Sequence, residues 1–459
     1  MLSQLLQPEI TSLIEERKLS TLKEILSEWT PADIAELISQ HPENEQAIIF
    51  RILPHSTATD TFEYLEFEQQ MNLLKAMGKE EVAKILNEMS PDDRTALLEE
   101  LPSSAAKHLI MLLSHEERKV AQTLLGYPEN SIGRLMTPDY LAVQPEWTIK
   151  EALDYIRSNG KDSETLNIIF VVDDKGKLID DIKIREFLLT PLDKRVLDLM
   201  DENFIAMHVN DDQETAVEIF KKYDRIALPV VDSQEVLIGL VTVDDVLDVA
   251  EEEATEDIHK LGGVEALDES YSTISFANMI KKRAGWLAIL FVGEMFTATA
   301  MGFFEGELSK AIVLGLFLPL IISSGGNSGS QASTLVIRAL SLGDISLKDW
   351  FFVMRREFIS GVVLGAILAV IGFLRISIWQ ATSGMYGAHW MLVAFTVSFA
   401  LLGVVMWGTL AGSMLPIILK KFGADPAASS APLVATIVDV TGLIIYFTVA
   451  IVIMHGTLL

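Results

Sequence analysis

Long apolar stretches fill the last third of the chain. Each of five stretches provides about the 20 residues that a helix needs to cross the hydrocarbon core of a bilayer. They are Trp286–Phe304, Ile312–Ile337, Phe358–Leu374 with Ile376–Trp379 directly beyond it, His389–Leu419 and Pro426–His455. Buried core helices of a soluble protein could explain one such stretch, but not five in succession. The pattern therefore predicts a multidomain membrane protein with a five-helix transmembrane domain at residues 281–459.

The first part of the chain alternates apolar and polar positions over much shorter distances. Residues 1–130 predict an α-helical domain in which short amphipathic helices, separated by Pro-containing turns, stack into a superhelix. No catalytic constellation is visible in these residues, so they are expected to serve as a platform.

Residues 131–249 contain an internal repeat, because Leu135 and Leu199 begin two units that are 64 residues apart. Each unit predicts a helix, a β-branched strand and a final helix, with the strands at Ile168–Val172 and Ile226–Val231. This order resembles a tandem pair of α/β CBS domains, which are regulatory modules that often bind adenosine ligands.

An acidic segment joins this repeat to the first apolar stretch. Residues 244–257 carry eight carboxylates and no basic side chain, and a connecting helix with its linker is predicted at residues 244–280. Apolar residues at helical spacing should form the buried face of this helix. They are Val243, Leu247, Ala250, Ala254 and Ile258. Like charges one turn apart destabilise a helix, so either water solvates the acidic face or hard cations such as Mg²⁺ or Ca²⁺ bind to it.

The net charge of −28 is confined to the first 284 residues, which hold 56 acidic and 28 basic side chains. Such acidity favours cations over nucleic acid as partners, and the absence of cysteine excludes a disulfide scaffold. Most basic residues that flank the apolar stretches lie on one side of the predicted membrane domain. They are Lys281, Lys282, Arg283, Arg338, Lys348, Arg355, Arg356, Lys420 and Lys421, against Lys310 and Arg375 on the other side. The positive-inside rule therefore predicts a cell-membrane protein with a cytoplasmic N-terminus and an external C-terminus.

Two carboxylates, Asp439 and Glu294, lie well inside the apolar stretches. Charged groups inside a membrane are costly and usually functional. Ala435 and Gly442 share a helical face with Asp439 and allow close approach of another helix, which favours an ion path over an acid satisfied within the bundle. The opposite interpretation is favoured for Glu294, because nothing around it converges.

A polar run follows Pro319 in the second apolar stretch, where residues 323–331 consist mainly of Gly, Ser and Asn. Such residues at membrane depth predict a weakened helix with free backbone carbonyls beside an ion path. A tight helix–helix contact is the alternative interpretation.

Several segments together resemble the MgtE family of magnesium channels over nearly the full length. Besides the tandem CBS repeat, they are Met89-Ser90-Pro91-Asp92-Asp93-Arg94, Ala254-Thr255-Glu256-Asp257-Ile258-His259-Lys260-Leu261, Gly325-Gly326-Asn327-Ser328-Gly329-Ser330-Gln331 and Ala435-Thr436-Ile437-Val438-Asp439-Val440-Thr441-Gly442. The resemblance implies a homodimer in the lipid bilayer, with a pore on the two-fold axis lined by the second and fifth membrane helices. It also implies passive Mg²⁺ uptake that is shut off when cytoplasmic Mg²⁺ binds to the acidic domains.

The same resemblance implies which residues of this chain bind ions or line the pore. For Mg²⁺ in the pore they are Asp439, Ala435 and Asp425. For regulatory Mg²⁺ they are Asp93, Glu214, Asp224, Asp245, Asp248, Glu253, Glu256 and Asp257. The implied pore lining consists of Pro319, Gly325, Gly326, Asn327, Gly329, Gln331 and Gly442. This chain departs from the family pattern at Ala431, where a polar Asn is expected, and at Glu294, which is more polar than expected.

An adenine nucleotide, ATP or another, is a candidate regulator of the CBS pair. In the second CBS copy, Thr242 and Asp245 match the Thr and Asp that hold a ribose in CBS domains, whereas the first copy lacks this pair. The alternatives are a nucleotide-regulated secondary transporter of another divalent cation or solute, and a membrane-anchored nucleotide sensor without a pore. An enzyme is not expected, because no nucleophile–base pair or His cluster is visible.

Overall fold

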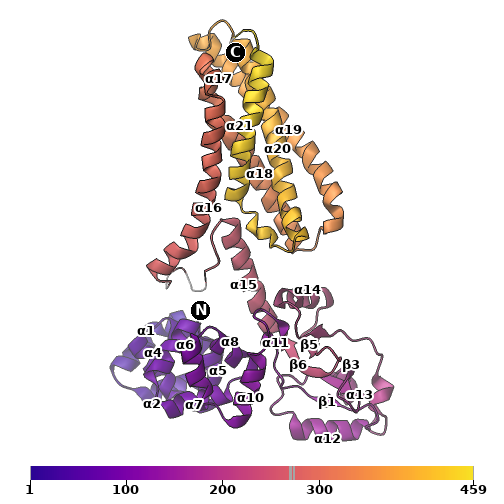
Figure 1. Cartoon of the computed structure of the whole chain (residues 1–459). Coiled ribbons are helices and arrows are strands. Elements are labelled where there is room, and N and C mark those ends of the chain that lie inside the picture. Colours follow the sequence, from indigo (N-terminus) through magenta and orange to yellow (C-terminus); the bar gives the residue numbers. More distant parts are fainter. Residues whose placement is uncertain (1, 268–270, 272–273, 458–459) are drawn as a thin grey trace. The chain divides into compact units, whose positions relative to one another are not determined.

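The computed structural model describes residues 2–267, 271 and 274–457. Its helices and strands, most of which are labelled in Figure 1, belong to two compact units, residues 1–251 and 252–459. Residues 268–270, 272 and 273 of the predicted linker lie outside the described residues.

Short helices follow one another through the N-terminal half of the first unit, as the amphipathic pattern predicts. They are α1 (Leu2–Glu15), α2 (Leu19–Leu26), α3 (Pro31–Ser39), α4 (Glu43–Ile52), α5 (His55–Glu63), α6 (Phe67–Ala76), α7 (Lys79–Glu88), α8 (Pro91–Glu99), α9 (Ser103–Ile110) and α10 (His115–Leu124). Pro31 and Pro91 stand in the first turns of α3 and α8, where their missing N–H groups leave no hydrogen bond unmade. One face of each helix contributes Leu and Ile side chains to a continuous core, so the predicted helical domain is confirmed.

The second half of this unit repeats one arrangement of strands and helices. It contains α11 (Ile132–Leu135), β1 (Ala142–Val143), α12 (Ile149–Asn159), β2 (Ile168–Val172), β3 (Leu178–Lys183), α13 (Ile184–Leu189), the 3-10 turn η1 (Val196–Leu199), β4 (Met207–His208), α14 (Gln213–Tyr223), β5 (Ala227–Val231), β6 (Leu237–Thr242) and the start of α15 (Val243–Leu261). In each repeat the first strand pairs parallel to the second, and the second pairs antiparallel to the third. Ile168 faces Lys183 in the first sheet, and Ala227 faces Thr242 at the same place in the second.

The two sheets share an apolar core, which includes Phe170 and Leu240. The hydroxyl of Tyr140 donates a hydrogen bond to the carbonyl of Leu237 at 2.9 Å and so ties the first repeat to the second. The predicted strand Ile168–Val172 is present with those bounds, and the strand of the second repeat begins at Ala227, one residue later than predicted. The tandem α/β architecture is therefore confirmed.

The acidic segment forms one helix, α15, but a different face is buried from the one predicted. Val246 and Val249 are buried, whereas Leu247 and Ile258 are 63% and 67% exposed in the chain. The reason is local: directly after β6, Val246 joins the core of the second repeat. The amphipathic spacing alone could not show which of two apolar rows would meet that core.

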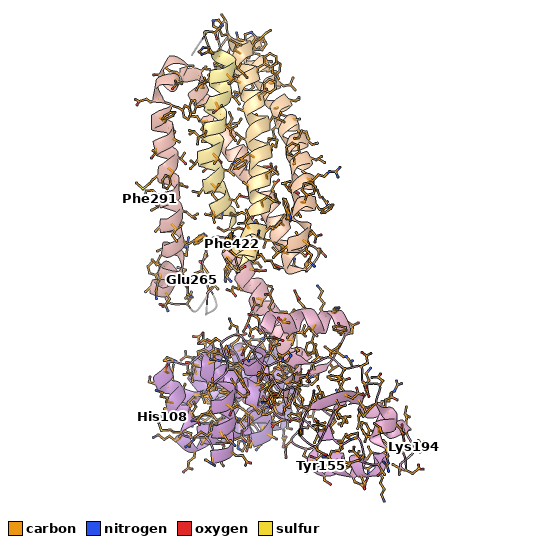
Figure 2. The ribbon with its side chains drawn as sticks, turned by 45° about the vertical axis from the view of Figure 1, so that its right-hand side comes forward. His108, Tyr155, Lys194, Glu265, Phe291 and Phe422 are labelled. Atoms are coloured by element: carbon orange, nitrogen blue, oxygen red, sulfur yellow. The ribbon has the colours of Figure 1, made fainter. Side chains whose placement is uncertain are left out.

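The second unit contains the five helices that are long and apolar enough to span a membrane among the described residues. Its elements are α16 (Phe276–Phe303), α17 (Glu305–Lys310), η2 (Ile312–Phe317), α18 (Leu318–Ser341), η3 (Leu347–Asp349), α19 (Trp350–Ser383), α20 (Trp390–Lys421), η4 (Pro426–Ala428) and α21 (Ala431–Met454). In Figure 2 the side chain of Phe291 on α16 points away from the neighbouring helices, in keeping with its 65% exposure.

Helix α18 runs without interruption through the Gly/Ser/Asn run, so the predicted weakening of this helix is wrong. The run instead serves close packing against α20. A Cβ atom at Gly408 would clash with the carbonyl oxygen of Gly325, and one at Gly412 would clash with that of Gly329. Glycines on both helices let the backbones touch, which is the alternative interpretation of the run.

Candidate functional site

Asp439 lies in the middle of α21 beside the glycine run of α18. A Cβ atom at Gly326 would stand 3.8 Å from Oδ1 of Asp439 and 3.4 Å from the Cβ of Ala435. In the described part of the chain no side chain or backbone group donates a hydrogen bond to this carboxylate. The predicted pore residues Asp439, Ala435 and Gly326 are thus brought together, and the carboxylate is left available to a ligand.

Glu294 also approaches this place, which the sequence did not indicate. Gly293 packs so closely on α21 that a Cβ atom there would lie 2.7 Å from the Thr436 side chain. Thr436 is one turn before Asp439, and Glu294 follows Gly293 directly. The carboxylates of Glu294 and Asp439 accordingly interact electrostatically. The interpretation that nothing converges on Glu294 is wrong.

One face of α18 carries polar side chains that the chain leaves uncovered. Pro319, Ser323, Asn327 and Gln331 recur every four residues and are all exposed. Asn327 donates a long hydrogen bond to Ser323 at 3.5 Å along this face. The buried members of the predicted lining, such as Gly325, pack instead against other helices. Polar groups on a membrane helix are disfavoured next to lipid, so this face is suited to water or to another chain.

The segment before α21 is held by hydrogen bonds to α18. Ser330 donates to the carbonyl of Ala431 at 3.2 Å, and Ser333 donates to that of Ser429 at 3.0 Å. Asp425 accepts from the backbone N–H of Ala427 at 2.8 Å and caps η4. The expected Asn amide is absent at Ala431, and only its backbone carbonyl takes part in this network.

Asp425 contacts the end of α15 by an ion pair with the ammonium group of Lys260. Lys260 Nζ lies 2.6 Å from Oδ2 of Asp425 and also forms an ion pair with Glu256. Ser341 donates to Asp257 at 3.3 Å. Burial raises the pKa of Asp257, and the charge of Asp425 raises it further. Three carboxylates that the sequence predicts as metal ligands therefore surround this part of the second unit.

A second acidic cluster lies inside the first unit, where the start of α8 meets the start of α15. Its members interact electrostatically with one another, and they are Glu63, Asp92, Asp93, Glu164, Asp244, Asp245 and Asp248. Ser90 donates to Asp93 at 2.6 Å, and Thr242 donates to Asp245 at 2.5 Å. These two hydrogen bonds fix how the carboxylates point but leave most of their oxygen lone pairs without a donor.

Burial and mutual repulsion raise the pKa values of carboxyl groups in this cluster, so that full ionisation of the cluster is unfavourable. Burial raises the pKa of Asp93 to about 6, and the neighbouring Asp92 adds to the shift. Burial raises the pKa of Asp245 as well, followed by the charge of Asp92. Burial raises the pKa of Glu63 to about 7, against a hydrogen bond from the N–H of Ser90. Such groups favour either protons or bound cations.

Sequence reasoning placed Asp93, Asp245 and Asp248 in this cluster and missed Asp92, Glu63 and Glu164. Asp92 stood next to a predicted ligand, whereas Glu164 comes from a loop for which the sequence holds no signal. In the described residues, no three His, Asp or Glu side chains stand close enough to hold one metal ion as they are placed. The metal-ligand assignments, including Glu253 on α15 and Glu214 in the first turn of α14, remain predictions.

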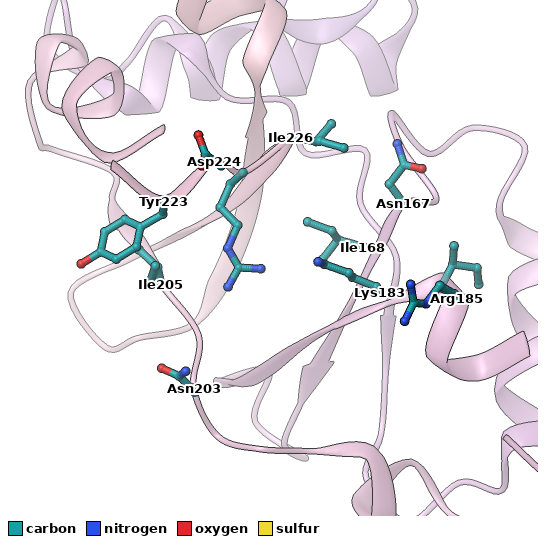
Figure 3. Close-up of a pocket in the computed structure, with 11 residues that line it drawn as sticks. Asn167, Ile168, Lys183, Arg185, Asn203, Ile205, Tyr223, Asp224 and Ile226 are labelled. Atoms are coloured by element: carbon teal, nitrogen blue, oxygen red, sulfur yellow. The ribbon is translucent and has the colours of Figure 1, made fainter. Parts of the chain in front are cut away.

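A cavity of about 560 Å³ opens between the two CBS repeats (Figure 3). Basic side chains dominate its charged lining, and Tyr223 offers an aromatic ring. The lining consists of Asn167, Ile168, Lys183, Ile184, Arg185, Asn203, Ile205, Tyr223, Asp224, Arg225 and Ile226. Arg225 also forms an ion pair with Asp181 at 3.4 Å.

The residues predicted to bind a regulatory ion or a nucleotide relate to this cavity in two different ways. Asp224 ends α14 with a φ of 49° and lies in the cavity wall, among basic residues, instead of among the carboxylates. Thr242 and Asp245 are not among the residues that line this cavity, and Thr242 donates a hydrogen bond to Asp245. The cavity therefore presents a mainly basic surface, and the ribose-binding role of Thr242 and Asp245 stays a prediction.

Comparisons with known proteins agree with this architecture. Residues 318–449 match the family model described as a divalent cation transporter, residues 29–130 match the MgtE intracellular N domain, and residues 132–189 and 196–252 match CBS domains. The magnesium transporter MgtE of Thermus thermophilus is 34% identical over 440 residues, which cover 95% of this chain and 96% of that protein. The chain belongs to the MgtE family. It is a multi-pass membrane protein of a magnesium transporter family.

Other relatives of this MgtE protein support the same conclusion. The magnesium transporter MgtE of Bacillus subtilis is 30% identical, with 97% of each chain covered. A solved structure of the cytosolic domain of the Mg²⁺ channel MgtE in complex with ATP has 31% identity, a TM-score of 0.51 and covers 53% of this chain and 99% of its own. A second, of the soluble part of a magnesium transporter, has 26% identity, a TM-score of 0.52 and covers 55% and 99%.

The acidic cluster predicts an unusual dependence of stability on pH. The folded unit keeps protons on Asp93 and Glu63 that the unfolded chain has already released, so the stability that these two groups contribute is fully present near pH 4 and is lost as pH rises through about 7. Residues 1–262, measured in chelator, should lose about 2 kcal/mol of unfolding free energy between pH 5.5 and pH 8. Urea titration at each pH gives this value.

The Asp245→Asn variant should flatten this loss, because it removes one of the crowded charges. Asp154→Asn is the matched control, because Asp154 is exposed and forms its ion pair with Arg157. Stability of the unaltered fragment that rises between pH 5.5 and pH 8 would contradict the account of this cluster.

Proposed function

We propose that this MgtE protein is a passive, Mg²⁺-selective channel for magnesium uptake. The observation that supports this most directly is the Asp439 carboxylate beside the buried Gly326, which directly precedes Asn327 on the exposed polar face of α18. Mg²⁺ gives up its water reluctantly, so carboxylate and carbonyl oxygens that contact its hydration shell are a suitable lining. The inside-negative membrane potential would drive the ion inward.

The pore forms between two copies of the chain. Asn327 and Gln331 cannot face lipid without losing hydrogen bonds, and a second α18–α21 pair around a two-fold axis would cover them. Each copy then contributes one Asp439, so that two carboxylates face the ion. Pro319, Asn327 and Gln331 line this path, with Ala435 beside the ion.

Regulation comes from the acidic groups outside the membrane helices. When cytoplasmic Mg²⁺ is high, ions neutralise the cluster of Asp93, Asp245 and Asp248 and the carboxylates at the end of α15, and the pore is held shut. When Mg²⁺ falls, the unneutralised charges repel and the helices shift. Several bound ions acting together supply the differential affinity that a two-state gate requires. Gating by cytoplasmic Mg²⁺ requires that the first unit lies in the cytoplasm. The basic residues that flank the membrane helices favour this orientation, with the C-terminus outside.

The cavity between the CBS repeats is proposed as a site for a regulatory nucleotide. A volume of about 560 Å³ suits a small ligand. Lys183 and Arg185 suit its phosphates, and Tyr223 suits the stacking of a base. The ATP complex of a related cytosolic domain favours ATP among adenine nucleotides.

A secondary transporter of an organic or anionic solute is the competing function. It would need a basic or aromatic group converging with the polar face of α18, whereas the charged group that interacts with Asp439 is the carboxylate of Glu294. The pairing of carboxylates favours a divalent cation as cargo. The chain is not proposed to be an enzyme.

Replacement of Asp439 by Ala should abolish Mg²⁺ flux into proteoliposomes, because the pore would lose the charges that face the ion. Flux is followed with an Mg²⁺-sensitive dye, and Mn²⁺, Co²⁺ and Ca²⁺ are added as competitors. Asp344→Asn, which neutralises an exposed acid of the same unit, is the control. Mg²⁺ uptake by Asp439→Ala at the rate of the control would refute the proposed pore.

Replacement of Asp245 by Asn should raise the cytoplasmic Mg²⁺ concentration that closes half of the channels by about threefold or more, because one ligand of the closed state is lost. Patch-clamp recording from inside-out membranes measures this concentration. Asp154→Asn should leave it unchanged. A closing concentration that stays the same when Asp245, Asp248 and Asp257 are each neutralised would rule out this gate.

Replacement of Tyr223 by Ala should weaken ATP binding to the purified protein by about tenfold, since one base–aromatic stack is lost. Isothermal titration calorimetry reports the affinity directly. Thr242→Val should bind ATP like the unaltered protein, because Thr242 lies outside the cavity lining. Equal loss in both variants, or no loss in Tyr223→Ala, would reject this cavity as the nucleotide site.

A further inference from the structure

A lysine stands where the acidic end of α15 meets the segment before α21. Lys260 Nζ bonds to Oδ2 of Asp425 at 2.6 Å and pairs with Glu256, which lies one helical turn before it. A lysine side chain is ordinarily protonated at neutral pH, and two carboxylate partners favour its charged form. The side chain is therefore an ammonium ion placed between two carboxylates.

A third carboxylate shares this place but is not neutralised in the same way. Asp257 precedes Lys260 by three residues and lies on the same side of α15, where it accepts a hydrogen bond from Ser341 at 3.3 Å. Asp257 and Asp425 carry like charges that repel each other. The single positive charge of Lys260 thus stands against three carboxylates. The net charge at this place is negative and attracts a further cation.

We propose that Lys260 sets the affinity of this place for Mg²⁺, because its ammonium is a tethered cation that competes with the metal ion for Asp425 and Glu256. The inference rests on the proposed function, in which the carboxylates at the end of α15, Glu256 and Asp257, bind regulatory Mg²⁺, and it adds Asp425, which the resemblance assigned to the pore. An arriving Mg²⁺ ion must displace two charge-assisted hydrogen bonds of Lys260. The metal therefore binds only at a higher concentration than it would at the bare carboxylates.

The position of the contact gives this competition a consequence for the gate. Asp425 caps the turn η4, which leads directly into α21 and its Asp439. Lys260 belongs to the helix that ends just before Gly262 and Gly263. Exchange of the ammonium for Mg²⁺ changes the bonds between α15 and the start of the pore helix, so Lys260 determines the Mg²⁺ concentration at which that change takes place.

The test uses the full-length protein in detergent and a readout that does not depend on transport. The chain contains no cysteine, so Ala424→Cys provides a single thiol at an exposed position next to Asp425. The rate of maleimide labelling is measured against Mg²⁺ concentration at constant ionic strength. In this background, Lys260→Met and Lys260→Gln should each lower the Mg²⁺ concentration at half-maximal protection by about tenfold, the scale of one charge-assisted hydrogen bond.

Two control variants separate this effect from a general loss of positive charge. Lys260→Arg keeps the charge and should stay within about threefold of the parent protein. Lys282→Met removes a nearby charge that pairs with Glu265 at 3.6 Å and should leave the half-protection concentration unchanged. An unchanged or higher concentration in both Lys260→Met and Lys260→Gln would overturn the role of Lys260 while leaving the proposed regulatory site intact.

Failure of the proposed function would look different in the same experiment. If Mg²⁺ does not protect the thiol in the parent protein, and Asp425→Asn changes nothing, these carboxylates do not bind regulatory Mg²⁺ and the inference falls with that proposal. Protection that is present in the parent and lost in Asp425→Asn confirms the site, and the Lys260 variants then decide the inference alone.

Discussion

Crowded carboxylates that cannot all be charged at once are the constraint on which the rest of this molecule depends. In the first unit, Asp92 and Asp93 at the start of α8 face Asp245 at the start of α15, and burial makes each charge costly. Protons or metal ions can relieve that cost, whereas apolar packing cannot. The apolar core of each domain holds the backbone that carries these acids in place. The carboxylates therefore stay close together and continue to repel one another.

The membrane unit solves the opposite problem, because it must bring a few polar groups together inside an apolar bundle. Glycines 325 and 329 on α18 and glycines 408 and 412 on α20 bring the two backbones into contact. Gly326, on the next face of the same helix, then stands beside Asp439. Close packing on one side of α18 thus leaves its polar side, with Asn327 and Gln331, exposed.

Much of this organisation could be predicted from the sequence, because the signals are long or repeated. Five apolar stretches, a 64-residue repeat and short amphipathic helices each extend over many residues. The errors concern contacts that the local pattern does not encode. Which apolar row of α15 is buried depends on the sheet before it, and the approach of Glu294 to Asp439 depends on how Gly293 packs against Thr436. The glycine run was ambiguous because the same residues suit a broken helix and a tight contact.

Hydrogen–deuterium exchange in the full-length protein tests the central claim most directly. The amides of α8 and of residues 243–251 are compared in chelator and in millimolar Mg²⁺, with KCl matching the ionic strength. The account predicts markedly slower exchange of both segments in Mg²⁺ alone, because neutralised carboxylates hold the two helix starts together. Equal exchange rates in chelator and Mg²⁺ would contradict it.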